Sequence, residues 1–222
     1  MAFALHLAPD TAPRSPVARL RSPHRETPSR NKRKDKLVQF NRHDQIPNGD
    51  NKLWQIQSGY VRTLSWNSEG DPIPLGFWRA GDIFGEAIAR TSPYEAQCLS
   101  SVTARPLNME AGFSYEAAMA QVQQSNDLLR IVHCRQLNQS LLQFLCWLAS
   151  RFGQPTHEGL EIPVKLIHQD IADAIGATRV TIARQIKQLE REGKLRWSGS
   201  EKVVYTTTLS QFSLDSDCQL EL

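Results

Sequence analysis

Long apolar runs are missing from this sequence, which excludes one large class of protein. None of its apolar stretches approaches the roughly 18 residues that a membrane-spanning helix needs. Hydrophobic residues still make up 40% of the 222 residues, and charged residues 22%, which is enough to bury a core. We therefore expect one or two folded domains and no membrane partner.

Clustered metal ligands and catalytic motifs are missing as well. The six histidines form no HxH or HExxH pattern, and no glycine-rich phosphate loop follows a strand. Glu86 and Glu95 could pair as carboxylates, but surface solvation is the simpler explanation. The cysteines form no CxxC pair and stand at Cys98, Cys134, Cys146 and Cys218. We expect no metal, no cofactor, no catalytic residue and no enzymatic activity, in a reducing cytoplasm.

Net charge is small, but it is unevenly distributed. The chain carries a formal charge of +3. Segment 1–36 holds nine basic and three acidic residues. Segment 163–208 holds eight basic and five acidic residues. Segment 37–162 is acidic, with nine basic and twelve acidic residues, and segment 209–222 has three acidic residues and no basic ones. This distribution is compatible with nucleic-acid contact through one module, although many solvated surfaces share it.

The first 36 residues combine five prolines with arginine and serine and have almost no periodic apolar positions. Such a composition cannot offset the entropy of ordering, so we predict a disordered basic tail. Its alternatives are a plain solvated tail, an arm that contacts phosphates or an anionic partner, a targeting peptide, and translation assigned from a start codon that lies too far upstream.

Residues 37–112 alternate short apolar runs with turn signals. The runs are LWQI (53–56), YVRTLSW (60–66), PLGFW (74–78) and DIFG (82–85). Strands of this length and spacing predict a small barrel, roll or sandwich. Pro74 has no N–H to donate, which predicts an edge strand or a strand that begins at this residue.

From residue 113 to 153 the apolar period becomes helical. Residues 115–122 predict a short helix, and Ser125–Phe152 predicts a long one without internal proline or glycine. Its apolar positions are too many for one stripe. The helix could pack on its own domain alone, but contact with a second subunit is favoured, so we expect a homodimer.

Residues 154–208 contain the pattern on which the functional hypothesis depends. A helix is predicted from about His168 to Ile175, with Gly176 at a turn. Thr178 is the predicted cap of a second helix, which runs to about Glu192. Two short strands follow, at 195–197 and 202–205, which completes a winged helix-turn-helix. An acidic tail is expected over 209–222.

The second helix has one apolar face and one polar face. Ile182, Ile186 and Leu189 form the buried stripe. Arg179 and Arg184, five residues apart, are expected to point in related directions and to contact guanine in a major groove. The complete set of DNA-contact candidates is Thr178, Arg179, Val180, Thr181, Arg184, Gln185, Lys187 and Lys202. The competing interpretation is an amphipathic helix pair with arginine on its solvated face.

The stretch QDIADAIGATRVTIARQIKQLEREGKL resembles the helix-turn-helix of the CRP/FNR family, and ATRVTIAR is similar to the family's cyanobacterial nitrogen regulators. LWQIQSGYVRTLSWNSEG and RAGDIFGE resemble its effector-domain β-roll. The resemblance implies an α+β protein with an N-terminal β-roll, a connecting long helix and a C-terminal winged helix-turn-helix. It also implies a dimeric transcription regulator of palindromic double-stranded DNA, with GTA/TAC half-sites and RNA polymerase as a further candidate partner. By position, Arg179, Val180 and Arg184 match the family's base-contacting residues.

This sequence also departs from the family pattern. Gly85 and Glu86 match the phosphate cassette of the cyclic-nucleotide-binding members, and Phe84, Gly85, Glu86 and Ala87 are the candidate effector-pocket residues. PYEAQC (93–98) has no basic residue where those members place an arginine. The connecting helix looks shorter than in relatives, and His168 stands where many have a serine or threonine cap. We therefore expect regulation without cyclic nucleotide. The alternative is a sensor or protein-interaction module on the β-roll with vestigial DNA binding.

Overall fold

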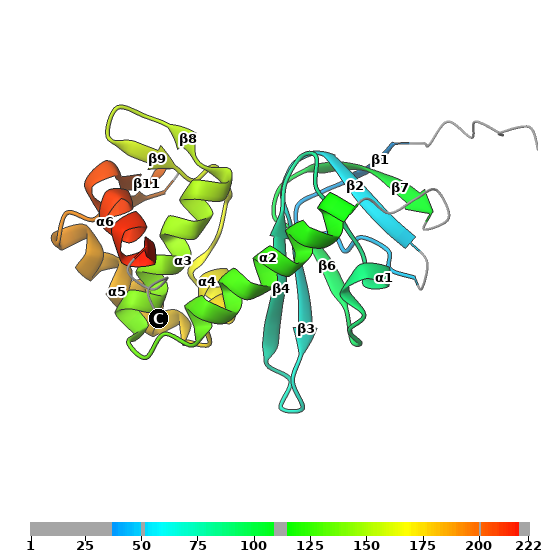
Figure 1. Ribbon diagram of the computed structural model, residues 1–222, viewed down its shortest axis with the longest axis horizontal. Coiled ribbons are helices and arrows are strands. Elements are labelled where there is room, and N and C mark those ends of the chain that lie inside the picture. The colour runs from blue at the N-terminus through cyan, green and yellow to red at the C-terminus, as the bar shows by residue number, and fades with distance from the viewer. Residues whose placement is uncertain (1–36, 50–51, 109–114, 200, 218–222) are drawn as a thin grey trace, which may run out of the picture. The chain divides into compact units, whose positions relative to one another are not determined.

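The computed structural model describes residues 37–49, 52–108, 115–199 and 201–217. Strands dominate the first part, up to residue 108, and helices with a small sheet follow from residue 115 (Figure 1). The expected α+β class is therefore confirmed. Within the described ranges, no helix is both long enough and apolar enough to span a bilayer. Segment 1–36, the predicted disordered tail, lies outside the described residues.

Two antiparallel sheets form the N-terminal part, with strand orders β1-β7-β2-β5 and β4-β3-β6. Each of the four apolar runs that we expected as strands contains a strand, although only Ile83 and Phe84 of the run 82–85 belong to one. β4 lies at a sheet edge, as Pro74 predicted. The strands are β1 (Val38–Phe40), β2 (Lys52–Ser58), β3 (Val61–Trp66), β4 (Pro72–Trp78), β5 (Ile83–Phe84), β6 (Glu95–Cys98) and β7 (Val102–Asn108).

Aromatic side chains from both sheets fill the interior of this β-roll. Trp54 and Trp78 are buried there, and the Trp78 indole donates to the Thr63 hydroxyl at 3.0 Å. Gly59 makes the turn between β2 and β3 with a φ of +93°, and a Cβ there would lie 2.2 Å from the Ser101 carbonyl oxygen. Glycine is therefore required at this turn. One short helix, α1 (Glu86–Ala89), follows β5.

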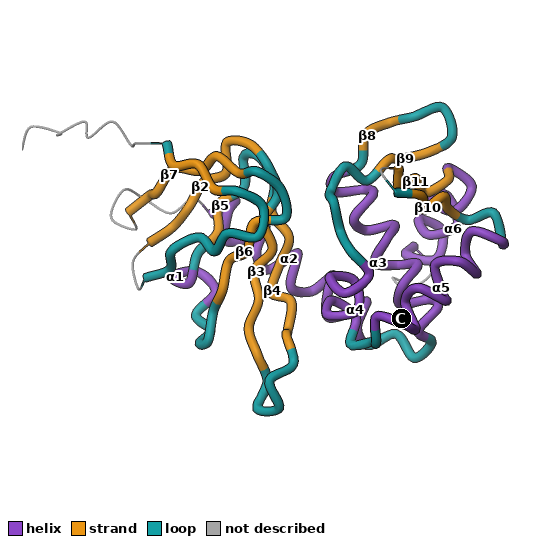
Figure 2. The backbone as a smooth tube through the Cα atoms, turned by 180° about the vertical axis from the view of Figure 1, so that it is seen from behind, coloured by secondary structure: helices purple, strands orange, loops and turns teal. Residues whose placement is uncertain are grey.

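The predicted single helix over Ser125–Phe152 is wrong. The structure has α2 (Tyr115–Val132) and α3 (Leu137–Phe152), with a break at 133–136 (Figure 2). α2 starts ten residues before the predicted helix, so Ser125 lies inside α2 and caps nothing.

Tertiary contacts hold the two helices on either side of the break. Gln124 of α2 is buried, and its amide oxygen accepts the Phe77 N–H of β4 at 2.6 Å. Ile131 of α2 lies in the same hydrophobic core as Phe144 of α3. Across the break, the Ser140 hydroxyl of α3 donates to the Ile131 carbonyl of α2 at 2.8 Å and satisfies one free helix end. Both helices therefore contribute to one core, and α2 is in addition bonded to β4.

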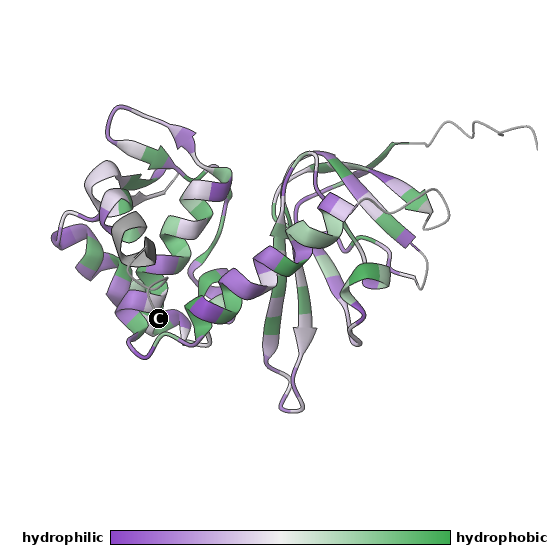
Figure 3. Ribbon diagram, in the orientation of Figure 1, coloured by the Kyte–Doolittle hydropathy of each residue, from purple (hydrophilic) through white to green (hydrophobic). Residues whose placement is uncertain are grey.

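α3 is the centre of the C-terminal part. In Figure 3, green marks its apolar residues, and nine of its residues are buried. Around it lie α4 (His168–Ile175), α5 (Arg179–Arg191) and a sheet of order β10-β11-β9-β8. The strands of that sheet are β8 (Gln154–Pro155), β9 (Gly159–Glu161), β10 (Leu195–Ser198) and β11 (Glu201–Tyr205). The winged helix-turn-helix is confirmed, and its sheet has two more strands than expected.

Part of the predicted acidic tail is a helix. Thr206–Asp217 forms a helix, α6. Leu209 and Phe212 pack against the core that α3 organises. These two apolar residues, three positions apart, gave too weak a pattern to predict a helix without knowledge of that core.

A buried ion pair joins β3 to α4. The Arg62 guanidinium lies 3.0 Å from the Asp170 carboxylate and 3.5 Å from Asp173, and Arg62 is only 8% exposed. Its Nε donates to the Gln97 side-chain oxygen at 2.9 Å. Because charges removed from water need such partners, these groups depend on one another.

Replacing Arg62 with methionine should therefore destabilise the protein strongly. It leaves two carboxylates near each other without their cation, which costs about 3–5 kcal/mol of unfolding free energy. Urea unfolding would measure the loss. The matched control is Lys194→Met, which removes a cation from the surface pair with Glu192 and should leave the unfolding midpoint almost unchanged. Equal midpoints for the two variants would show that the carboxylates of α4 do not depend on Arg62.

Candidate nucleic-acid interface

The helix-turn-helix is built by two local signals, both predicted. Gly176 ends α4 in the left-handed conformation, with a φ of +67°, and its N–H donates to the Ala172 carbonyl. Thr178 caps α5, because its hydroxyl accepts the Thr181 N–H at 3.2 Å. The predicted inner stripe of α5 is buried and consists of Ile182, Ile186 and Leu189. The outer face of α5 is therefore left to solvent.

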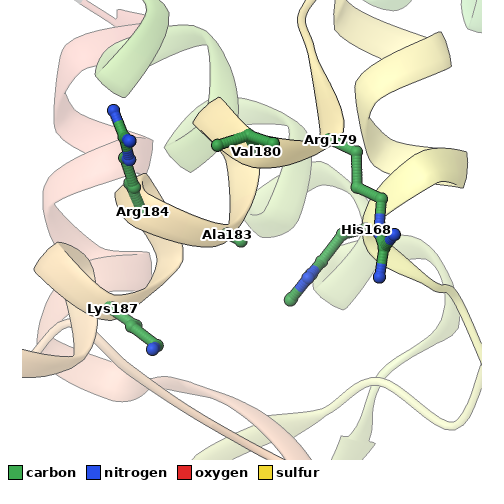
Figure 4. Close-up of a pocket in the computed structure, with 6 residues that line it drawn as sticks. All are labelled: His168, Arg179, Val180, Ala183, Arg184 and Lys187. Atoms are coloured by element: carbon green, nitrogen blue, oxygen red, sulfur yellow. The ribbon is translucent and has the colours of Figure 1, made fainter.

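A basic hollow of about 370 Å³ lies along that outer face (Figure 4). We use this name for the surface lined by His168, Arg179, Val180, Ala183, Arg184 and Lys187. Val180 is 60% exposed, and both arginines are exposed. Its described lining contains three permanent cations and a histidine but no carboxylate. Such a surface suits an anionic partner that also presents apolar groups.

The two arginines do not point in related directions, contrary to expectation. In Figure 4, Arg179 extends toward His168, whereas Arg184 projects on another side of α5. The reason is helix geometry, since five residues turn the helix by about 500°, or about 140° beyond one full turn. Together they cover a wide arc of the helix surface.

Two of the other α5 candidates are less exposed than expected. Thr181 is half-buried, and its hydroxyl bonds the Thr178 hydroxyl at 2.8 Å. Gln185 is half-buried, and its amide oxygen is buried with no hydrogen-bond partner among the described residues. Their places at the edge of the buried stripe explain this. Lys187 is exposed and lines the basic hollow.

Lys202 differs most from its predicted position. It lies in β11 with only 6% of its surface exposed, and its ammonium lies 5.4 Å from the centre of the Trp197 ring. Burial lowers its pKa, as do the nearby charges of Arg42 and Lys165. A cation covered in this way cannot contact a phosphate without rearrangement.

The N-terminus of α4 also differs from expectation. The capping position is Ile167, not His168, and isoleucine has no side-chain acceptor. Asp170 compensates for half of the missing cap, because its carboxylate accepts the Ile167 N–H at 2.8 Å. His168 is instead the first residue of α4.

His168 is the site residue that sequence reasoning missed as a member of this surface. Its ring stacks on Trp197, with 6.4 Å between ring centres and 28° between ring planes. His168 and Arg179 lie on different helices, with the Gly176 turn between them, so no single-helix periodicity connects them. Only the packing of α4 against α5 brings them together.

The candidate effector-pocket residues lie at the start of α1. Phe84 is buried and packs against Trp78, with 6.1 Å between ring centres. Ala87 is buried too, and a Cβ at Gly85 would lie 2.5 Å from the Lys52 carbonyl oxygen. Glu86 is half-buried. These residues are thus close to a filled aromatic core.

The electrostatics beside Glu86 do not suit a phosphate. Burial raises the pKa of the neighbouring Tyr94 hydroxyl strongly, the hydrogen bond with Thr63 opposes this, and the charge of Glu86 adds to the rise. The neighbourhood therefore offers a neutral phenol and a carboxylate, and the residues of 93–98 add no cation. A cyclic nucleotide phosphate does not fit these groups. In the described part of the chain, no group of three or more His, Cys, Asp or Glu residues could hold a metal ion.

Comparison with known proteins agrees with this architecture. Residues 139–209 match the family profile of the Crp-like helix-turn-helix domain. The chain is 34% identical over 192 residues to the regulatory protein CysR of Synechococcus elongatus, with 85% of each chain covered. It is 38% identical over 161 residues to the global nitrogen regulator of Synechocystis sp., covering 65% of this chain and 71% of that one.

Solved structures share the fold. A CRP-family transcriptional regulator from Thermus thermophilus matches with a TM-score of 0.64 at 21% identity, over 81% of this chain and 96% of that one. FixK2 from Bradyrhizobium japonicum also matches with a TM-score of 0.64, at 18% identity, over the same shares of the two chains. This chain therefore belongs to the CRP/FNR family of transcription regulators and carries that family's helix-turn-helix DNA-binding domain.

Proposed function

We propose that this regulator binds a palindromic DNA site as a homodimer, with α5 of each subunit in a major groove. The observation that supports this most directly is the basic hollow on the outer face of α5, whose described lining has no carboxylate. Two such helices about 34 Å apart would meet half-sites one duplex turn apart. The similarity to the nitrogen regulators suggests half-sites of the GTA/TAC type.

Within this interface, each residue type has a chemical role. Arg184 and Arg179 are suited to bidentate hydrogen bonds with guanine, and Val180 to contact with a thymine methyl group. Lys202 is left out of the interface because it is buried. The residues that would lie near phosphates are Thr178, Thr181, Gln185 and Lys187.

An apolar stripe on α2 supports dimerisation. Exposed apolar residues of α2 recur at heptad-like spacing. One of them, Leu129, has 59% of its surface exposed. The opposite side of α2 packs on β4 through buried Gln124 and Leu128. Unpartnered apolar groups in such a row favour burial against a second copy of the helix. The stripe consists of Tyr115, Met119, Val122, Leu129 and Val132.

Regulation in this proposal does not use a cyclic nucleotide, because the carboxylate of Glu86 disfavours a phosphate and residues 93–98 supply no cation. The proposal gives the protein no catalytic role. RNA polymerase stays a candidate partner, as the family resemblance implied. A protein with this function works where the chromosome is, in the bacterial cytoplasm.

Replacing Arg184 with alanine should weaken DNA binding and relax its selectivity. The loss of one bidentate contact costs about 1–3 kcal/mol, or roughly 5- to 150-fold in dissociation constant. Competition gel shifts would measure this on a duplex with a GTA-N8-TAC site against a scrambled duplex. The measurement should span a salt series, because the phosphate contribution depends on salt.

Lys52→Ala is the matched control, since it removes one positive charge from an exposed position of the β-roll. It should leave both affinity and selectivity near those of the original protein. Unchanged selectivity in the Arg184→Ala variant would refute its base-contact role. If the unaltered protein shows no sequence-dependent shift even at low salt, the sensor alternative is favoured.

Leu129→Glu should convert the dimer to a monomer. A carboxylate within the apolar stripe would have to be desolvated in the interface, which is strongly unfavourable. Sedimentation velocity at micromolar concentration would report the mass, and the variant should lose affinity for the palindrome.

Gln123→Glu adds the same charge to α2 outside the stripe, where Gln123 bonds Asp127 at the surface. That variant should stay dimeric. A Leu129→Glu protein that sediments as a dimer would show that another surface joins the subunits.

A further inference from the structure

His168 is the one titratable group in the basic hollow without a permanent charge. It is half-buried, and its ring stacks on Trp197. Within the described ranges, neither ring nitrogen has a hydrogen-bond partner in the protein, and the ring faces a surface that we assign to DNA. Figure 4 shows the Arg179 side chain extending alongside it.

The groups around this imidazole are mostly cationic. From α5, Arg179 and Lys187 face it. From β11, the Lys202 ammonium lies over the Trp197 ring on which His168 stacks. Burial is the largest cause of a lowered pKa of His168, followed by the charges of Arg179 and then Lys187. In the free protein the ring is therefore mainly neutral at neutral pH.

The carboxylates near His168 are already engaged. Asp170, on the same helix, binds the Arg62 guanidinium and accepts the Ile167 N–H. Glu190, from α5, accepts the backbone N–H of Trp197 at 2.8 Å. Neither is available to hold a proton on the imidazole.

We propose that His168 contacts a DNA phosphate and takes up a proton when the protein binds DNA. This inference rests on the proposed function. A phosphate in the hollow would replace the repulsion from Arg179 and Lys187 with a direct attraction for the imidazolium. Both nitrogens of the protonated ring can donate to phosphate oxygens, whereas a neutral imidazole can donate from one nitrogen only.

The direction of the pH effect follows from the coupling between proton uptake by His168 and DNA binding. Below the pKa of the free protein both states hold the proton, and far above the pKa of the complex neither does. Between these values binding takes up a proton, so DNA affinity rises as the pH falls. Each unit by which DNA raises the pKa of His168 adds about tenfold in affinity per subunit.

The test is the pH dependence of the dissociation constant. Fluorescence anisotropy with a labelled GTA-N8-TAC duplex would be measured from about pH 6 to pH 8, the range in which histidine titrates. Ionic strength is held constant. We expect affinity at the lower pH to be roughly tenfold higher or more. His168→Gln, which stays neutral, should bind with little dependence on pH.

Two further variants separate charge from structure. His168→Arg keeps a permanent cation and should bind at high pH about as tightly as the original protein does at low pH. His157→Gln removes an exposed histidine from the turn between β8 and β9, at the sheet edge far from β10, and should keep the full pH dependence. Circular dichroism of each variant confirms that it is folded.

The outcomes are distinct. A pH dependence that persists in His168→Gln overturns the inference, even if that variant binds more weakly at every pH. A pH-independent affinity of the original protein overturns it as well, while leaving the proposed function intact. If the original protein fails to prefer the palindrome at any pH, the proposed function fails first and the inference falls with it.

Discussion

The carboxylate of Asp170 is the contact on which the geometry of the interface most depends. One of its oxygens accepts the Ile167 N–H and so closes the first turn of α4, whose capping position has no polar side chain. The other oxygen pairs with Arg62 of β3 at 3.0 Å. A single buried side chain therefore starts the first helix of the DNA-binding motif and attaches it to a strand of the β-roll. Such pairs add little net stability, but they define one arrangement, since alternatives leave buried charges unpaired.

One hydrophobic core joins the two helices that lie between the β-roll and α4. Leu128 of α2 packs in the same core as Phe144 of α3, and Phe77 of β4 belongs to that core too. α2 is also held to β4 by Gln124, whose amide oxygen accepts the Phe77 N–H. The outer side of α2 stays apolar and exposed, which gives the dimer proposal its physical basis.

Charge is distributed according to the partner each part faces. The β-roll encloses aromatic rings and places a carboxylate and a neutral phenol at the start of α1. Around the basic hollow α5 presents Arg179, Arg184 and Lys187, and no carboxylate stands among the described lining residues. Burial, followed by the charges of Arg179 and then Lys187, lowers the pKa of His168. Surfaces that place like charges near one another in this way oppose stability, and such surfaces are commonly functional sites.

Local chemistry was enough to predict much of this protein. The strands of the β-roll, the edge position of Pro74, the Gly176 turn and the Thr178 cap depend on neighbours a few residues away, so the sequence alone determined them. The family resemblance added the order of the domains.

What only the tertiary structure decided involves residues that are distant in sequence. α2 and α3 share one core although the break at 133–136 separates them, and the burial of Lys202 follows from the packing of β11 against Trp197. Arg62 meets Asp170 across two parts of the chain, and His168 meets Arg179 only because α4 packs on α5. Periodicity predicts which face of an element is buried, but not which other element covers it. The sequence therefore determined the elements of the DNA-binding motif, and the packing between them decided which side chains line its surface.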